Sequence, residues 1–299
     1  MAKKIFRTAG YILLLIFAYM AFQVCFTFIS MTVGVVYADL KGILSVDSLA
    51  QLAEYETLLS LPEANNIYIW SMSIGLFLSA LAMLLFLYMI KGYRIRLNLL
   101  SSMSSRSLLY STLLVFSSMF ALNIFVQWFG LEDKLTDELG GIAHNVLGVI
   151  TISLVAPLLE EVLFRGAIQG YMLRRYNPWV AIVSAALVFG IFHLNPVQTL
   201  YATLIGIVFG WIYYRTGSLL SVIVGHVLNN SIASVALLFL PESEALPMPA
   251  GVISPEAQVV SEFVVFLFFA TLSVYFAVKL HRAQPPVPSP WHDVTDSVE

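Results

Sequence analysis

The chain has 299 residues, of which 59% are hydrophobic and only 11% are charged. This composition excludes an ordinary soluble domain and indicates an integral membrane protein. The formal net charge of -3 is small, and the absence of any basic tract argues against nucleic acid as a partner.

Eight apolar stretches follow one another along the chain, each near the roughly 20 residues that a helix needs to cross about 30 Å of hydrocarbon. They lie at about residues 11–36, 67–90, 108–129, 146–172, 179–194, 197–214, 219–240 and 259–280. Only Asn195 and Pro196 separate the short fifth and sixth stretches, so a re-entrant pair is the alternative to two full crossings. The sequence therefore predicts an all-α polytopic transmembrane helical bundle of about eight spans.

The basic residues indicate the orientation, because Lys and Arg gather in cytoplasmic loops. With both termini inside, twelve of the fifteen basic residues lie in inner segments, Lys41 and Lys134 lie in outer ones, and Arg165 lies within a span. We therefore expect both termini to be cytoplasmic and the protein to be a multi-pass protein of the cell membrane. The first apolar run, at about 26 residues, is longer than the roughly 7–15 of a cleaved signal, which favours an uncleaved helix.

The chain contains no internal repeat, and residues 1–284 are predicted to form a single transmembrane domain. The leucine spacing in the acidic outer loop 39–66 suggests a short amphipathic helix, and a plain loop is the alternative. Residues 285–299 are rich in proline and are expected to form a disordered cytoplasmic tail. Cys25 is the single cysteine, cannot form an internal disulfide, and is expected to be a buried structural thiol.

Two adjacent glutamates, Glu160 and Glu161, lie inside the fourth predicted span. A charge at membrane depth costs roughly 2.5 kcal/mol or more, so each carboxylate needs a partner, water or a reaction. Glu161 precedes Arg165 by four residues, the favourable order for an ion pair, while Glu160 points about 100° around the helix. Pro157 removes an amide donor and is expected to open room for water beside Glu160. Glu161 is thus the structural candidate and Glu160 the candidate general base.

Three polar side chains in later apolar spans could join Glu160, namely His193, His226 and Asn230. His226 and Asn230 are four residues apart and share one helix face. Depth can be counted from the cytoplasmic end of each span at about 1.5 Å per residue. Glu160 and His193 then lie at about 21 Å, His226 at about 10 Å and Asn230 at about 16 Å. All four residues can therefore line one cavity that opens toward the cytoplasmic half of the membrane.

A carboxylate, two imidazoles and an amide supply what peptide hydrolysis requires: a base for water and donors for the oxyanion. In one arrangement Glu160 and His193 activate the water, while His226 and Asn230 form the oxyanion hole. In the other, Glu160, His193 and His226 bind zinc, since two histidines, a glutamate and an open fourth position form a known catalytic site. No His-Glu-x-x-His motif is present, so ordinary zincin chemistry has no support.

At these residues the chain resembles the family of intramembrane endopeptidases that includes CAAX prenyl proteases and bacteriocin-processing enzymes. Glu-Glu-x-x-x-Arg stands at residues 160–165, Phe-x-x-x-His at 189–193 and His-x-x-x-Asn at 226–230. The resemblance covers about residues 146–240, which would form the protease core. It implies an α-helical membrane protease that cleaves near the C-terminus of a prenylated protein or within a small membrane-associated peptide.

The resemblance also implies a role for each matched residue. Glu160 and His193 would activate water, and His226 with Asn230 would support the oxyanion. The pair formed by Glu161 and Arg165 would hold the site together.

Members of this family are often called metalloproteases, while a metal-free glutamate mechanism has also been argued for them. We favour the metal-free mechanism without a cofactor, because Asn is an uncommon zinc ligand and a His–Asn pair suits an oxyanion hole. Two other functions remain as alternatives. One is a non-catalytic membrane protein of the same fold, for bacteriocin immunity or complex assembly. The other is a proton-coupled transporter, for which the expected inverted repeat is not found.

Overall fold

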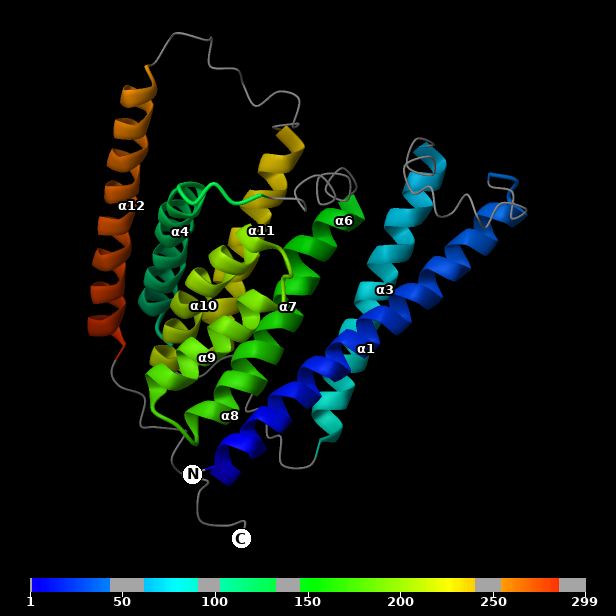
Figure 1. Cartoon of the computed structure of the whole chain (residues 1–299), viewed down its shortest axis with the longest axis horizontal. Coiled ribbons are helices and arrows are strands. Elements are labelled where there is room, and N and C mark those ends of the chain that lie inside the picture. The colour runs from blue at the N-terminus through cyan, green and yellow to red at the C-terminus, as the bar shows by residue number, and fades with distance from the viewer. Residues whose placement is uncertain (1, 44–61, 91–102, 133–145, 240–253, 285–299) are drawn as a thin grey trace. The chain divides into compact units, whose positions relative to one another are not determined.

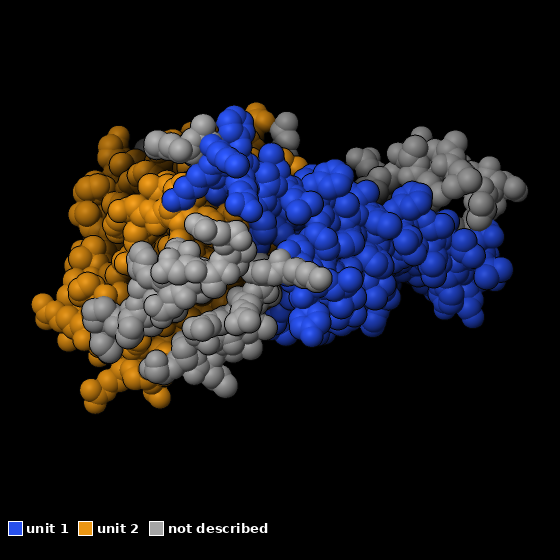
Figure 2. Space-filling model, turned by 90° about the horizontal axis from the view of Figure 1, so that it is seen from below, with its two compact units in different colours: residues 1–94, 140–159 blue, residues 95–139, 160–299 orange. Residues whose placement is uncertain are grey.

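The computed structural model describes residues 2–43, 62–90, 103–132, 146–239 and 254–284 (Figure 1). Within these ranges the chain is almost entirely helical and contains no strand, which confirms the all-α prediction. The chain divides into two compact units, coloured separately in Figure 2. The first comprises residues 1–94 and 140–159, and the second comprises residues 95–139 and 160–299.

Seven helices in the described part of the chain are long and apolar enough to cross a membrane. They are α1 (Ala2–Leu40), α3 (Pro62–Met89), α4 (Ser105–Gln127), a composite helix over Val146–Leu173, α10 (Pro196–Thr216), α11 (Leu219–Phe239) and α12 (Pro255–Ala283). The multi-pass architecture is therefore confirmed. At the fifth predicted span lies α9 (Pro178–Ile191), which has 14 residues. It is roughly 21 Å long, shorter than the roughly 30 Å hydrocarbon layer.

The turn between α9 and α10 explains why the fifth predicted span is short. Leu194 has a φ of 56°, in the left-handed region that an α-helix cannot continue through. Asn195 precedes Pro196, which also disfavours helical backbone, and its Oδ1 accepts a hydrogen bond from the amide of Gln198 to cap α10. The prediction that placed His193 inside a helical span is therefore wrong, since His193 lies in this turn.

In the first unit, α1 and α3 pack closely through small residues. A Cβ added to Gly75 would lie 2.6 Å from Thr27 Cα, and one added to Gly34 would overlap the Ser71 hydroxyl. Across the pair, Ser30 Oγ donates a hydrogen bond of 2.7 Å to the Ser71 carbonyl. Close approach at glycine and serine is typical of helices that associate within a membrane.

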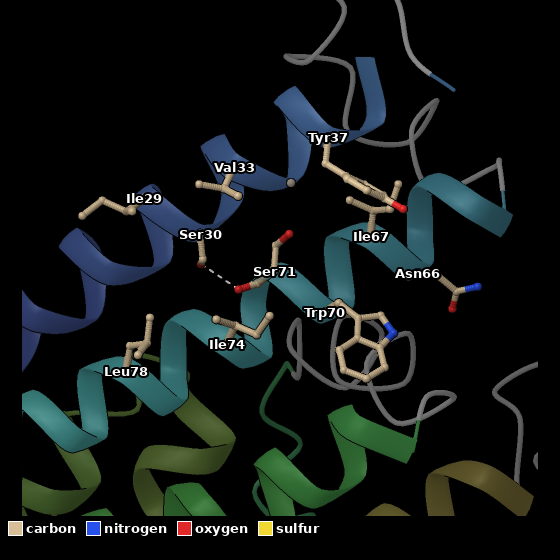
Figure 3. A pocket seen from close by; sticks show the side chains of 11 residues that line it. Ile29, Ser30, Val33, Tyr37, Asn66, Ile67, Trp70, Ser71, Ile74 and Leu78 are labelled. Carbon is tan, nitrogen blue, oxygen red and sulfur yellow. Dashed lines mark hydrogen bonds between the residues drawn. The ribbon is translucent and has the colours of Figure 1, made fainter. Parts of the chain in front are cut away.

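The same two helices form an apolar groove with a volume of about 440 Å³ (Figure 3). Aliphatic side chains such as Ile29, Val33 and Ile74 line it, together with the aromatic rings of Tyr37 and Trp70. Its walls therefore offer mainly apolar contacts.

Cys25 lies on α1 with its side chain exposed, so the expectation of a buried structural thiol is wrong. The face of α1 that contacts protein and the face that does not are both apolar. Hydropathy alone therefore does not identify the buried face of such a helix.

In the second unit, α4 contacts α10, α11 and α12. The ring of Phe120 on α4 stacks on that of Phe269 on α12, with 4.8 Å between their centroids. Two buried serines on α4 donate within the helix, Ser111 to the Leu108 carbonyl and Ser117 to the Leu113 carbonyl, whereas Ser118 donates to Ser273 Oγ on α12. α9 packs against α10, and the part of the composite helix that follows Glu161 contacts α9, α10 and α11.

Two glycines allow α10 to approach the composite helix. A Cβ on Gly206 would lie 3.3 Å from a guanidinium nitrogen of Arg165, and one on Gly210 would lie 2.9 Å from Gln169 Oε1. Arg165 Nη2 donates to the Gly206 carbonyl at 3.4 Å, and Gln169 Nε2 donates to the Gly210 carbonyl at 2.8 Å. Two side chains one turn apart thus bind two backbone carbonyls one turn apart.

Several predictions fall outside the described residues or are not tested by them. The possible amphipathic helix of loop 39–66 falls mainly on residues 44–61, and the predicted tail covers 285–299, which are not described. The cytoplasmic placement of both termini and the single transmembrane domain stay predictions.

Candidate active site

The helix that carries the paired glutamates changes its pitch on both sides of them. From its start it consists of α6 (Val146–Ile150), the π-helical η3 (Thr151–Val155), α7 (Ala156–Glu161), the π-helical η4 (Val162–Gln169) and α8 (Gly170–Leu173). Pro157 lacks the amide that would complete an α-helical bond to Ser153, and the wide turn of η3 lies at this point. π-Helical turns are rare and occur frequently at functional sites.

Glu161 and Arg165 form the ion pair that their spacing predicts, with 2.7 Å between Glu161 Oε1 and Arg165 Nη1. Both side chains are buried, with exposed fractions of 0% and 1%. The guanidinium lies over the ring of Phe189, with 4.4 Å between Cζ and the ring centroid, and over that of Phe209 at 5.1 Å. A buried ion pair needs further partners of this kind to offset its desolvation.

His226 connects this ion pair to Glu160. Its Nδ1 lies 2.7 Å from Glu161 Oε1, and its Nε2 lies 3.7 Å from Glu160 Oε2. Glu161, ionised in its pair with Arg165, can only accept hydrogen bonds, so His226 Nδ1 donates. In the neutral form of the ring, Nε2 then carries a lone pair that faces Glu160. The motif spacings do not predict this position of His226 between the two glutamates.

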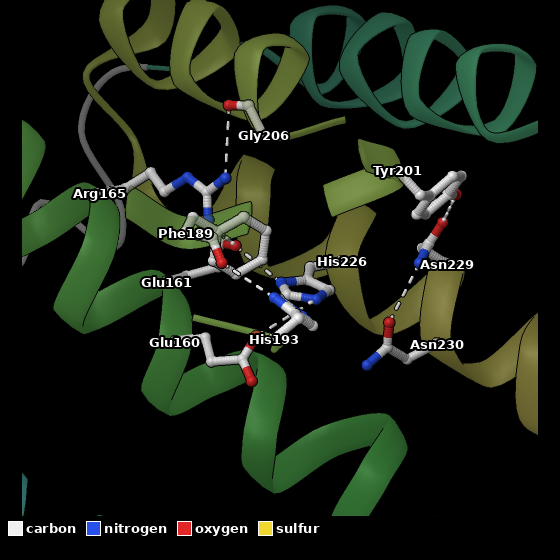
Figure 4. A network of polar contacts seen from close by, with 10 residues as sticks. All are labelled: Glu160, Glu161, Arg165, Phe189, His193, Tyr201, Gly206, His226, Asn229 and Asn230. Carbon is white, nitrogen blue, oxygen red and sulfur yellow. Dashed lines mark hydrogen bonds and ion pairs between the residues drawn. The ribbon is translucent and has the colours of Figure 1, made fainter. Parts of the chain in front are cut away.

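His193 is held in the same tautomer by a backbone contact. Its Nδ1 lies 2.9 Å from the Phe189 carbonyl, which can only accept, so Nδ1 donates and Nε2 keeps a lone pair. The Phe189 ring meets both imidazoles edge-on, with centroid distances of 4.9 Å to His193 and 5.9 Å to His226. Phe189 thus packs against both histidines and Arg165, and Figure 4 shows Glu160 beside this group.

Asn230 lies one helical turn beyond His226 on α11 and belongs to a second chain of hydrogen bonds (Figure 4). Tyr201 Oη, from α10, donates to Asn229 Oδ1 at 2.5 Å. Asn229 Nδ2 in turn donates to Asn230 Oδ1 at 3.1 Å. Neither Tyr201 nor Asn229 is among the predicted site residues. The adjacency of two asparagines was a signal for Asn229, whereas nothing in the sequence pointed to Tyr201.

The zinc alternative needs a carboxylate and two imidazoles around one point. Glu160 and His226 approach each other, but no group of three His, Cys, Asp or Glu side chains in the described ranges lies close enough to hold a metal ion. As they lie, Glu160, His193 and His226 do not fit the predicted zinc site.

The described helices define a polytopic helical membrane protein, in which a buried network joins Glu161, Arg165 and His226 and brings His226 within 3.7 Å of Glu160. Residues 142–232, which include all three motifs, match the family model described as type II CAAX prenyl endopeptidase, Rce1-like. This part of the chain is therefore similar to the family of membrane endopeptidases that its three motifs resemble.

A curated relative from Bacillus subtilis strain 168 carries the name "Putative membrane peptidase YdiL". It is 29% identical to this chain over 119 residues, which cover 40% of the chain and 49% of the relative. The match thus spans about half the length of that protein. No solved structure matches the chain.

Proposed function

We propose that this protein is an intramembrane endopeptidase in which Glu160 is the general base for an attacking water. The observation that carries the proposal is the different use of the two glutamates. Glu161 is fully buried and binds Arg165 and His226 through one oxygen. Glu160 keeps 17% of its side chain exposed, and 3.7 Å separate its carboxylate from His226 Nε2.

A separation of 3.7 Å between two acceptors exceeds a direct hydrogen bond, and a water that donates to both can span it. In the proposed reaction the water oxygen attacks the carbonyl carbon of the peptide bond while Glu160 takes a water proton. Asn230 donates to the resulting oxyanion, a contribution typically worth about 10²–10³ in rate. Glu160 then returns the proton to the departing amine as the C–N bond breaks, which leaves a carboxylic acid and an amine.

This assignment changes the role that the family resemblance implies for His226. With Nδ1 donating to Glu161, neutral His226 has no proton on Nε2 for an oxyanion. We therefore propose that Nε2 of His226 and Nε2 of His193 accept hydrogen bonds from the attacking water. Asn230 remains as the proposed oxyanion donor.

The proposed substrate is a prenylated protein C-terminus or a small membrane-associated peptide. We propose that membrane lipid surrounds the protein and that the reaction uses no cofactor. Two facts support this class of substrate. The family model that matches is described as a CAAX prenyl endopeptidase, and the curated relative is named as a membrane peptidase. The proposed location is the cell membrane.

The test uses purified full-length protein and a quenched fluorogenic peptide with a farnesylated cysteine fourth from its C-terminus. Wild type should cleave this peptide, and Glu160→Gln should lower kcat at least 10²-fold, within the range for general-base catalysis of about 10²–10⁴. The matched control is Glu256→Gln, whose carboxylate is exposed at the start of α12.

A second measurement compares the membrane peptides of cells that carry wild type or Glu160→Gln, which identifies substrates without choosing a probe. Equal activity of the two proteins in both experiments would reject the peptidase function and favour a non-catalytic role. Loss of activity with a chelator and its return with zinc would reject the metal-free mechanism.

A further inference from the structure

We propose that Tyr201 and Asn229 are positioning residues that hold the Asn230 amide as a hydrogen-bond donor toward the reacting carbonyl oxygen. The proposal rests on the peptidase function proposed above and adds two residues whose identity none of the three motifs specifies. Tyr201 comes from α10, whereas both asparagines come from α11. The oxyanion side of the site is therefore built by two helices.

The side chains form a continuous chain with one direction. The Tyr201 hydroxyl donates to Asn229 Oδ1 at 2.5 Å, and Asn229 Nδ2 donates to Asn230 Oδ1 at 3.1 Å. Asn229 is 8% exposed, and Tyr201 is half-buried. Because Asn229 uses the oxygen of the Asn230 amide, the nitrogen of that amide lies on the opposite side, as Figure 4 shows.

The direction of this chain decides what Asn230 can do. If the chain ran in reverse, the Asn230 nitrogen would bind Asn229, and its oxygen would face the developing oxyanion and repel it. Among the described residues, the Tyr201 hydroxyl proton has no acceptor other than Asn229 Oδ1. In the reversed chain Asn229 Nδ2 would donate to the Tyr201 oxygen, and the phenol proton would lose Asn229 Oδ1 as its acceptor, which disfavours reversal. The phenol thus selects the orientation in which Asn230 donates.

Removing the hydroxyl should therefore affect the chemical step and leave substrate binding intact. With the peptide described above, Tyr201→Phe should lower kcat about 10-fold and change KM less than about 2-fold. This loss in kcat is smaller than the loss of about 10²–10³-fold expected when an oxyanion donor is removed. The reason is that the Asn230 amide keeps its productive orientation in a fraction of the molecules. Asn229→Asp should have an effect at least as large, since an ionised carboxylate has no proton to donate to Asn230.

A double substitution separates positioning from a general structural role. Asn230→Ala alone should lower kcat about 10²-fold, and adding Tyr201→Phe to it should cause no further loss, because nothing is left to orient. A residue that only stabilises the fold would lower kcat by the same factor in both backgrounds. Tyr214→Phe, also on α10, is the matched control and should retain the wild-type kcat.

The outcomes distinguish this proposal from the one on which it rests. If Glu160→Gln abolishes turnover but Tyr201→Phe keeps the wild-type kcat, positioning is rejected and the peptidase function stands. Equal losses from Tyr201→Phe with and without Asn230→Ala also reject positioning. If wild type does not cleave, or Glu160→Gln is as active as wild type, the peptidase function fails and this proposal fails with it.

Discussion

The α1–α3 pair of the first unit and the network around Arg165 in the second hold membrane helices together by different contacts. The buried polar side chains of α1 and α3 in the described ranges are serines and a threonine, and glycines bring the backbones close. The second unit buries Glu161, Arg165 and His226 in one network. Between helices in lipid, close packing suffices for association, so costly buried charges point to function.

The largest expected effect follows from removing the cation of the buried network. Arg165→Met should destabilise the protein by about 3–5 kcal/mol, because the buried Glu161 loses its counter-charge. Thermal unfolding in detergent micelles measures the loss. The control is Arg175→Met, since the guanidinium of Arg175 is exposed and lies over the Tyr171 ring. A similar loss in both variants would contradict the importance of burial.

A steric change should give the next largest effect, this time in the α1–α3 pair. Gly75→Ala should cost about 1–3 kcal/mol, because its Cβ would meet the backbone of Thr27 at 2.6 Å and the helices must separate. Gly10→Ala on α1 is the control, since no atom lies within 4 Å of its added Cβ. The same unfolding measurement applies. If Gly75→Ala is as stable as Gly10→Ala, close packing does not hold the pair together.

A single polar contact between the same helices should matter less. Ser30→Ala removes the hydrogen bond to the Ser71 carbonyl and should cost about 0.6 kcal/mol, the average for such bonds in membranes. Thr32→Ala is the control, because Thr32 Oγ1 bonds only within its own helix, to the Phe28 carbonyl. A loss in Ser30→Ala above about 2 kcal/mol would contradict the minor role assigned to polar contacts in the α1–α3 pair.

The smallest effect on stability is expected at the proposed base. Glu160→Gln should change the free energy of unfolding by less than about 0.5 kcal/mol, because the side chain is partly exposed and makes no direct hydrogen bond to His226. Glu161→Gln should instead approach the loss seen with Arg165→Met. Equal destabilisation by the two glutamine variants would overturn the division between a catalytic and a structural glutamate.

The contacts that sequence reasoning recovered are short in range. The Glu161–Arg165 pair follows from a spacing of four residues on one helix. The bond between Glu161 and His226 joins residues 65 positions apart. Its formation depends on how α11 packs against the composite helix, which hydrophobic periodicity does not specify. The same holds for Tyr201 and Asn229, which come from different helices.

The helices were predicted more closely than their ends and faces. Apolar composition located seven long helices, because a membrane span requires a long apolar run. It extended the fifth span through His193, although α9 stops earlier, because hydropathy carries no information about the backbone conformation of Leu194. The two residues of the Phe-x-x-x-His motif therefore do not share one helix face: Phe189 lies in the last turn of α9, and His193 lies in the turn that follows it.

The bond between His226 and Glu161 also has a consequence for solvent exchange. The proton on His226 Nδ1 lies between two side chains that are 5% and 0% exposed, so it reaches water only when the surrounding helices open locally. In protein placed in heavy water, this imidazole proton should persist in nuclear magnetic resonance spectra long after exposed histidine protons have vanished. Its lifetime would report directly on how often the site opens.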